Sequence, residues 1–313
     1  IEGRRDNMFK ARIKILVHEL GIERFREKVE AEFQASEDDI LLIGKPEEDR
    51  IAAFFTPPAY EDLDDKPAAL EYQLNANADF AQWMARNIVP HKVPGYAIVN
   101  ISLKPIGGVP GDVTDTQMDQ VADLADEFSF GLMRTTHRQN LVLPDARQDQ
   151  LFALWEKLVS LGLATANLEQ ITDIISCPGL DFCSLANARS IPVAQRISER
   201  FGDLDRQYNV GDLRINISGC INACGHHHVG HIGILGVEKL GEEFYQVTLG
   251  GSSQTDADIG KIVGPAFSSD EIVNAIETLV ETYVDIRTDG ETFLETYRRV
   301  GQGPFKERLY DAD

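Results

Sequence analysis

The sequence predicts an α+β fold, in which helices form a layer on an antiparallel sheet over residues 96–162. The first observation is the order strand, helix, strand, helix that hydrophobic periodicity gives over residues 96–162. The second is that the pattern restarts at Ile171, where short strands alternate with helices and glycine-rich turns. With 313 residues the chain can form two domains with hydrophobic cores, and it contains no apolar run long enough to cross a membrane.

The first ninety residues are predicted to be helical and then acidic. Residues 8–34 repeat apolar positions at helical spacing, and Gly21 divides them into two helices. Residues 35–90 contain the acidic stretches PEEDR and YEDLDD. We expect this part to be a connector with short strands and one helix near residues 76–88.

The next elements form the predicted layer of helices on a sheet. Residues 96–103 alternate as a strand, and residues 114–128 have helical periodicity. Residues 131–143 are expected to form a strand pair or one long bent strand. An amphipathic helix follows over residues 148–162, with Leu151, Leu154, Trp155 and Leu158 on its apolar face.

After Ile171 a short strand is expected to lead into the first of two cysteine pairs. A helix is predicted over residues 185–201, and a strand over residues 213–218 leads to the second pair. The rest of the pattern predicts a hairpin of residues 231–239 and 244–251, then closing helices over 270–283 and 292–300.

The cysteines carry the most chemical information in the chain. All four belong to two tight pairs, CPGLDFC and CINAC, which contain Cys177, Cys183, Cys220 and Cys224. Four thiolates with no cysteine left over suit a [4Fe–4S] cluster, and the flanking glycines and Pro178 let backbone N–H groups face an anionic group. Two alternatives remain at this point: a structural zinc site, for which the first gap is wide, and two disulfides, which need an oxidising compartment.

The net charge of −21 limits the possible partners. It argues against nucleic acid, whose phosphates this surface would repel. Acidic electron-carrier proteins would be repelled as well, so a local basic patch or another polypeptide segment must provide a docking site. Thiols kept reduced for a cluster favour the cytoplasm.

Several separate segments resemble the sirohaem-dependent nitrite/sulfite reductases. They are CPGLDFCSLANARS, RINISGCINACGHHHVGHIGILG, FYQVTLGG and MRTTHRQNLVL, and the resemblance runs from about Asp6 to the end of the chain. It implies a ferredoxin-like half-domain followed by an α+β domain that binds a [4Fe–4S] cluster and sirohaem. It also implies that each of the four cysteines binds one iron of the cluster and that Cys224 is the proximal ligand of the sirohaem iron as well.

The resemblance suggests further residues that bind sirohaem. Asn222 matches a position against the macrocycle, and Arg12 and Lys14 are candidates to reach its carboxylates from the basic opening helix. The segment MRTTHRQNLVL is predicted to lie under the macrocycle as a strand. Its polar side chains would then occupy one face at every second position, with Gln139 on the other face: Arg134, Thr136, Arg138 and Asn140. An exposed sheet face is the plainer interpretation of the same pattern.

Four histidines close to the second cysteine pair look like a metal site. They are His226, His227, His228 and His231. Adjacent histidines in a strand cannot all converge on one ion, so we do not expect them to bind a metal. One of them could instead donate a hydrogen bond to a cluster sulfur or a propionate.

The resemblance also predicts the domain organisation and the partners. Residues 1–90 would end a preceding domain, 91–163 would be the ferredoxin-like half-domain, and 164–313 the cluster and sirohaem domain. The chain, whose opening IEGR is also a cloning-protease site, would be the C-terminal half of a longer enzyme. The cationic catalytic pocket would come mainly from the other half, so no catalytic residue is assigned here.

The activity implied is the six-electron reduction of sulfite to sulfide, with electrons from a ferredoxin, a flavodoxin or a flavoprotein reductase. The alternatives are a ferredoxin-type nitrite reductase, which forms ammonia, a cluster-only electron carrier, and a zinc-stabilised structural protein. The polar segment 134–140 speaks against the last two, because neither needs a row of Arg, Gln and Asn side chains.

Overall fold

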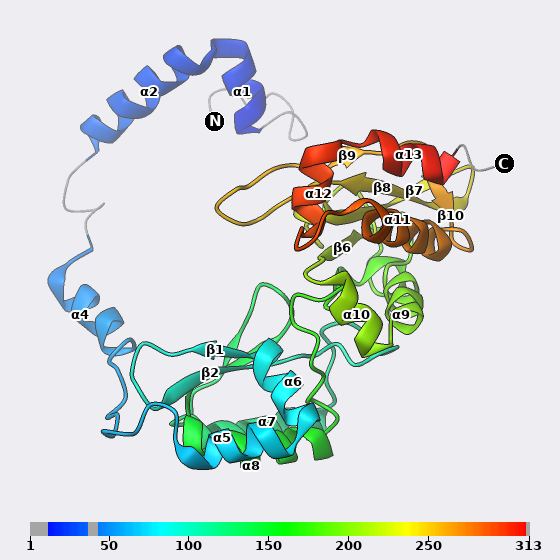
Figure 1. Cartoon of the computed structure of the whole chain (residues 1–313). Helices are drawn as coiled ribbons and strands as arrows, with labels where there is room; N and C mark the ends of the chain where they lie inside the picture. Colours follow the sequence, from blue (N-terminus) through cyan, green and yellow to red (C-terminus); the bar gives the residue numbers. More distant parts are fainter. Residues whose placement is uncertain (1–11, 37–42, 311–313) are drawn as a thin grey trace. The chain divides into compact units, whose positions relative to one another are not determined.

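The computed structural model describes residues 12–36 and 43–310, which divide into two compact units, residues 1–60 and 61–313 (Figure 1). The opening residues IEGR lie outside the described residues. The first unit contains helices α1 (Ile13–Leu20), α2 (Ile22–Ala35) and α4 (Lys45–Ala53). The predicted pair of helices is confirmed from Ile13 onward, and Gly21 separates them with a φ of 75°.

Helix α4 was not predicted, because its sequence has no helical repeat of apolar residues. Its charges pair along the helix instead: Lys45 with Asp49 at 2.7 Å, and Arg50 with Glu47 at 2.7 Å. Such pairs one turn apart each stabilise a helix by about 0.2–0.5 kcal/mol.

The second unit begins with an antiparallel sheet in the order β1-β2-β4-β3. Its strands are β1 (Ile88–Pro90), β2 (Tyr96–Ile101), β3 (Arg134–Thr135) and β4 (Leu141–Arg147). The helices of this part are α5 (Ala68–Ala76), α6 (Ala78–Asn87), α7 (Asp115–Phe128) and α8 (Leu151–Ser160). Figure 1 shows α5, α7 and α8 together on one side of the sheet. The buried core between these layers includes Phe80, Trp83, Val99, Leu143 and Leu154.

The strand pair predicted over residues 131–143 is confirmed by the antiparallel pairing of β3 and β4. The polar residues 136–140 between these strands form a hairpin turn, so the prediction of a polar strand face over 134–140 is wrong. Strand β3 ends at Thr135, and the chain turns back through Gln139, whose φ is 59°. The Thr136 hydroxyl accepts hydrogen bonds from the backbone N–H groups of Arg138 and Asn140, at 3.2 and 3.1 Å. A threonine side chain that binds the backbone in this way favours a turn over a continuous strand.

The second sheet has the order β10-β8-β7-β6-β5, with β9 beside β8. Its strands are β5 (Ile175–Ser176), β6 (Ile215–Ser218), β7 (Ile232–Lys239), β8 (Glu242–Leu249), β9 (Lys261–Ile262) and β10 (Phe267–Ser268). Strands β7 and β8 form the predicted antiparallel hairpin, but β5, β6 and β7 are parallel. The reason is the long connection from β5 to β6, which runs through two helices, as parallel pairing requires.

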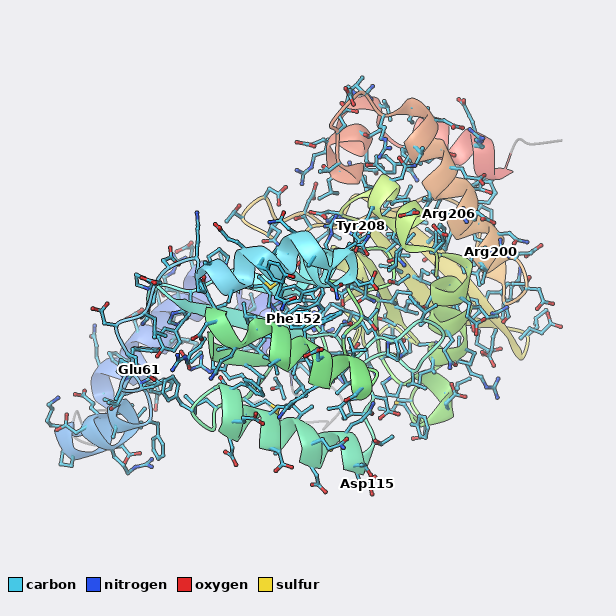
Figure 2. All side chains as sticks on the ribbon, turned by 60° about the horizontal axis from the view of Figure 1, so that its bottom comes forward. Glu61, Asp115, Phe152, Arg200, Arg206 and Tyr208 are labelled. Atoms are coloured by element: carbon cyan, nitrogen blue, oxygen red, sulfur yellow. The ribbon has the colours of Figure 1, made fainter. Side chains whose placement is uncertain are left out.

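The helices of this second part are α9 (Ile191–Arg200), α10 (Leu204–Val210), α11 (Ile272–Ile286), α12 (Phe293–Val300) and α13 (Gly303–Tyr310). The predicted helix over 185–201 begins only at Ile191. Residues before it form a loop, because the N–H groups of Asn187 and Ala188 donate to Gly219 O instead of to a helical carbonyl. Arg200 and Arg206, labelled in Figure 2, both bind Glu277 of α11 and fasten α9 and α10 to it.

Two buried cores lie within residues 61–313, one formed by residues from Leu70 to Ala166 and one by residues from Ile171 to Phe305. Helices α5 and α6 pack in the first core together with β2 and β4. The domain boundaries predicted at residues 90 and 163 stay predictions. Among the described helices, none is both long and apolar enough to cross a membrane.

Candidate metal centre

The two cysteine loops leave neighbouring parallel strands at the same edge of the second sheet. Ser176 at the end of β5 pairs with Ile217 of β6, and the Cys177 N–H donates to Ile217 O at 3.1 Å. Cys177 directly follows β5, and Cys220 follows β6 after one glycine. Because parallel strands run in the same direction, their carboxyl ends bring the two loops side by side.

The loops are also in direct contact with each other. The Gly219 N–H donates to Cys177 Sγ at 3.0 Å, and Gly219 O accepts hydrogen bonds from Asn187 and Ala188 in the other loop. A side chain at position 219 would place its Cβ 2.9 Å from the Cα of Gly179. The glycines therefore permit a close approach of two backbones whose N–H groups can face sulfur, which fits an anionic thiolate-bound cluster.

The second loop is shaped by a tight contact with its own strand. A Cβ at Gly225 would lie 1.9 Å from Ile217 O, so only glycine fits without a shift of the backbone. Asn216 Nδ2 donates to Gly225 O at 2.9 Å. Ala223 and His226 have φ values of 58° and 53°, and these left-handed residues wind the loop tightly around the cysteines.

All four cysteines are free thiols, but their exposure differs. Cys220 is buried, Cys177 and Cys183 are half-buried, and Cys224 is exposed. In the part of the chain that the structure describes, no three His, Cys, Asp or Glu side chains are grouped around a point where a single metal ion could bind.

Comparison with known families identifies both parts of the second unit. Residues 102–161 match the model of the nitrite/sulfite reductase ferredoxin-like half domain, and residues 168–309 match that of the nitrite and sulphite reductase 4Fe-4S domain. The chain belongs to the nitrite/sulfite reductase family. Both cysteine pairs lie within the 4Fe-4S domain, and the family implies a [4Fe–4S] cluster and sirohaem as its cofactors.

Individual relatives agree with this assignment. Sulfite reductase [ferredoxin] 2 of Mycolicibacterium paratuberculosis is 30% identical over 96% of this chain and 49% of its own length. The assimilatory ferredoxin-dependent nitrite reductase of Haloferax mediterranei is 28% identical over 93% of this chain and 46% of its own length. The chain thus spans about half the length of the curated relatives it matches.

Two solved structures have a similar fold. The structure of the Mycobacterium tuberculosis NirA protein matches with a TM-score of 0.65 and 26% identity, over 96% of this chain and 50% of that one. Dissimilatory sulfite reductase I matches with a TM-score of 0.57 at 13% identity, over 68% of this chain and 69% of that one. The second likeness concerns the fold alone.

The residues predicted to bind sirohaem lie in different surroundings. Arg134 and Asn222 are exposed, the latter between the second pair of cysteines. The guanidinium of Arg138 forms an ion pair with Glu169 and lies 4.0 Å from Asp173. Asn140 is buried, where it accepts from the Leu103 N–H and donates to Asp173 at 3.2 Å.

Two further predicted residues, Thr136 and Gln139, bind backbone groups. The Thr136 hydroxyl closes the hairpin turn, and the Gln139 amide binds Ser176. Arg12 and Lys14 are exposed in the first unit, Arg12 just before α1 and Lys14 within it. Sirohaem binding by each of these residues stays a prediction.

Sequence reasoning missed a buried ion pair between the two cores. Lys104 Nζ donates to Asp173 Oδ1 at 2.5 Å, and both side chains are at most 3% exposed. Burial lowers the pKa of Lys104, and the neighbouring Asp173 carboxylate opposes that change. Lys104 directly after the predicted strand 96–103 was the available signal, because a charge buried beside a core needs a partner.

The four histidines are divided between surface and interior. His226 and His228 are exposed, while His227 and His231 are buried. Burial lowers the pKa of His227 to about 4, and its Nδ1 has no hydrogen-bond partner among the described residues. Burial together with nearby arginines lowers the pKa of His231 to about 3, and its Nδ1 accepts from the Arg214 N–H at 3.3 Å.

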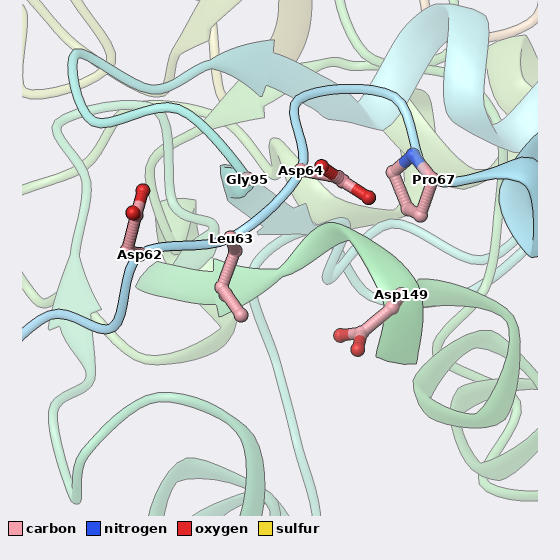
Figure 3. A pocket seen from close by; sticks show the side chains of 6 residues that line it. All are labelled: Asp62, Leu63, Asp64, Pro67, Gly95 and Asp149. Carbon is pink, nitrogen blue, oxygen red and sulfur yellow. The ribbon is translucent and has the colours of Figure 1, made fainter.

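An acidic pocket of about 310 Å³ lies away from the cysteines, in the first part of the unit (Figure 3). Its lining includes the carboxylates of Asp62, Asp64 and Asp149. Asp149 pairs with Arg147 at 2.8 Å, and this hydrogen-bonded guanidinium holds the pKa of Asp149 below its ordinary value. Because no cysteine lines it, this pocket is separate from the metal centre.

Proposed function

We propose that this chain is the C-terminal half of an assimilatory sulfite reductase, which reduces sulfite to sulfide by six electrons. The proposal assigns Cys177, Cys183, Cys220 and Cys224 as the ligands of the [4Fe–4S] cluster. Cys224 is also assigned as the ligand shared with the sirohaem iron. When bound, these groups supply the stored electrons and the iron centre at which the anion is reduced.

The observation that carries the proposal is the contact between the two cysteine loops within the matched 4Fe-4S domain. A backbone N–H from the second loop donates to the sulfur of the first, so both loops contribute to one thiolate environment. The exposure of Cys224 supports its shared role, because a thiolate that would hold a second group besides the cluster has to be accessible from outside its loop. Buried Cys220 is suited to the cluster alone.

Polar residues of this chain would hold the macrocycle, whereas the N-terminal half would supply the protons. Exposed Arg134 and Asn222 can donate to carboxylates, whereas the Arg138 guanidinium is already occupied by Glu169. The cationic groups that neutralise a small oxyanion and supply protons are proposed to come mainly from the N-terminal half. The electron donor is proposed to be a ferredoxin, since the relatives named above depend on it.

Metal analysis of the chain tests the ligand assignment. After anaerobic reconstitution with iron and sulfide, we expect about four irons and about four acid-labile sulfides per chain. The Cys220→Ser variant should lose this loading, while the control Ser184→Ala, an exposed residue beside Cys183, should retain it. A cysteine variant that loads iron and sulfide like the wild type contradicts the assignment. One tightly bound zinc and no sulfide would favour the structural alternative.

The choice of substrate is tested with the chain reassembled with its N-terminal half and loaded with both cofactors. We expect kcat/KM to be higher for sulfite than for nitrite. A higher value for nitrite would make the enzyme a ferredoxin-type nitrite reductase, the alternative that the Haloferax mediterranei relative favours. A reversible cluster signal with no turnover of either anion would favour a cluster-only electron carrier.

A further inference from the structure

The side chain of Gln139 pairs with both backbone groups of Ser176, the residue directly before Cys177. Gln139 Nε2 donates to Ser176 O at 2.8 Å, and the Ser176 N–H donates to Gln139 Oε1 at 3.0 Å. Ser176 lies in β5, the edge strand of the second sheet, which pairs with β6 on its other side. The amide thus takes the place of a further strand at the point where the first cysteine loop begins.

Gln139 is itself held in place before it reaches Ser176. Its backbone has a φ of 59°, in the left-handed region, within the turn that Thr136 closes. The neighbouring Arg138 carbonyl accepts a hydrogen bond from buried Lys104 Nζ. A Cβ at Gly111 would come within 2.8 Å of the Gln139 Cβ, so Gly111 leaves the space that the side chain occupies.

The consequence concerns the sulfur of Cys177. Fixing Ser176 on both edges of β5 fixes the backbone from which the Cys177 side chain extends. The Sγ atom then stays 3.0 Å from the Gly219 N–H. Hydrogen bonds to cluster sulfurs help to set the reduction potential, because they stabilise the more negative, reduced form.

We infer that Gln139 is a positioning residue for Cys177, which holds this ligand in register with the Gly219 N–H from across the boundary between the two cores. The inference rests on the proposed role of Cys177 as a cluster ligand. It gives Gln139 a different role from the predicted contact with sirohaem, since both polar atoms of its amide are used on Ser176.

The experiment compares Gln139→Leu with Gln148→Leu in the 313-residue chain. Gln148 is a matched control: its amide also binds backbone groups, donating to Tyr96 O at 3.2 Å and accepting from the Lys66 N–H at 3.1 Å. It lies in the first part of the unit, before α8, and binds no residue of either cysteine loop. Amide hydrogen exchange at Ser176, the rate of iron release to a chelator, and the midpoint potential of the reconstituted cluster are measured for each variant.

We expect Gln139→Leu to speed exchange at Ser176 and iron release by about tenfold, because two hydrogen bonds that hold β5 are lost. The midpoint potential should become more negative as the Gly219 N–H and the sulfur separate. Gln148→Leu should match the wild type in all three measurements. Gln139→Glu keeps an acceptor for the Ser176 N–H but loses the donor, so its exchange rate, iron release and potential should lie between those of the wild type and of Gln139→Leu. This variant is used if the leucine variant does not fold.

The outcomes separate this inference from the proposed function. A wild-type chain that binds no cluster under reconstitution overturns the proposed ligand set, and the inference falls with it. A wild-type chain that binds the cluster, with equal exchange, release and potential in Gln139→Leu and Gln148→Leu, overturns the inference alone. A lower melting temperature with unchanged potential and iron release would show a merely structural role and would also overturn it.

Discussion

The two cysteine loops are held in place by different means. The first loop, residues 177–190, begins beside polar side chains that come from the other core, above all Gln139. The second loop, residues 219–226, is held by its own sheet, through the close fit of Gly225 under Ile217 O and the bond from Asn216 to Gly225 O. One loop therefore depends on the association of two cores, and the other on backbone packing within one sheet.

This difference predicts which loop a given substitution should affect. Hydrogen bonds and ion pairs between cores are lost when either core shifts, whereas a tight backbone contact is sensitive mainly to added volume at one position. Substitutions in the polar network should therefore loosen the first loop selectively. Added volume at Gly225 should disturb the second loop more than the first, to which Ile217 O is joined by its hydrogen bond from the Cys177 N–H.

The largest effect is expected from breaking the ion pair between the cores. In Asp173→Leu, the Lys104 ammonium stays buried without its counter-charge, and Asn140 and the Glu169 N–H lose their acceptor. We expect the free energy of unfolding to fall by about 3–5 kcal/mol, measured by urea denaturation at pH 7.

A double variant sharpens that result. Lys104→Met combined with Asp173→Leu removes both charges, so most of the lost stability should return, as for other buried pairs replaced by apolar residues. Exchange at Ser176 should stay faster than in the wild type, because the Lys104 bond to Arg138 O is still missing. If Asp173→Leu alone lowers the free energy of unfolding by less than about 1 kcal/mol, the pair is not important for the two cores.

A smaller effect is expected at the second loop. The Cβ of Gly225→Ala would overlap Ile217 O at 1.9 Å, and the required backbone shift should cost about 1–3 kcal/mol. Gly303→Ala at the start of α13 is the control, since nothing lies within 4 Å of its Cβ. The thiol-labelling rate should rise at buried Cys220 in Gly225→Ala, and it should rise less at Cys177, which binds Ile217 O only through its backbone N–H. Equal changes at both cysteines would remove the distinction between the loops.

An effect confined to acidic pH is expected at His231, just before β7. Folding lowers the pKa of His231 from an ordinary value near 6.5 to about 3. Below about pH 6.5 the unfolded chain therefore binds a proton at His231 that the folded chain does not bind. The stability contributed by the neutral histidine is complete above that pH and is lost as the pH falls toward about 3. The charged groups that act on this histidine are Arg214, Arg138, Arg298 and Asp256.

His231→Asn isolates this contribution, because its amide oxygen can still accept from the Arg214 N–H but does not titrate. Between pH 6.5 and 4.5 the unfolding free energy of the variant should fall less steeply with decreasing pH than that of the wild type. The difference in slope should correspond to about one proton fewer taken up on unfolding. The buried His227 titrates in both proteins and cancels in the comparison. Parallel pH profiles would show that His231 does not carry this dependence.

Periodic segments of the sequence predicted the helices and the hairpin most closely. The pattern over 114–128 matches α7, and the predicted hairpin matches β7 and β8. Apolar spacing predicts such elements because each buries one face against a core. The prediction of a polar strand face over 134–140 was wrong because polar residues alternate there as in a strand without burying an apolar face. The Thr136 hydroxyl binds the backbone and favours a turn.

By itself the sequence determined the chemistry of this protein: two cysteine pairs, their glycine-rich surroundings and the family to which they belong. These features are local, because a motif keeps its ligand types and spacing wherever the chain carries it. Only the tertiary structure decided that β5 and β6 run parallel, that Gly219 faces Cys177, and that Gln139 reaches Ser176. Such contacts join residues tens of positions apart, and they form only when the two cores have packed and fixed the relative positions of their strands and turns.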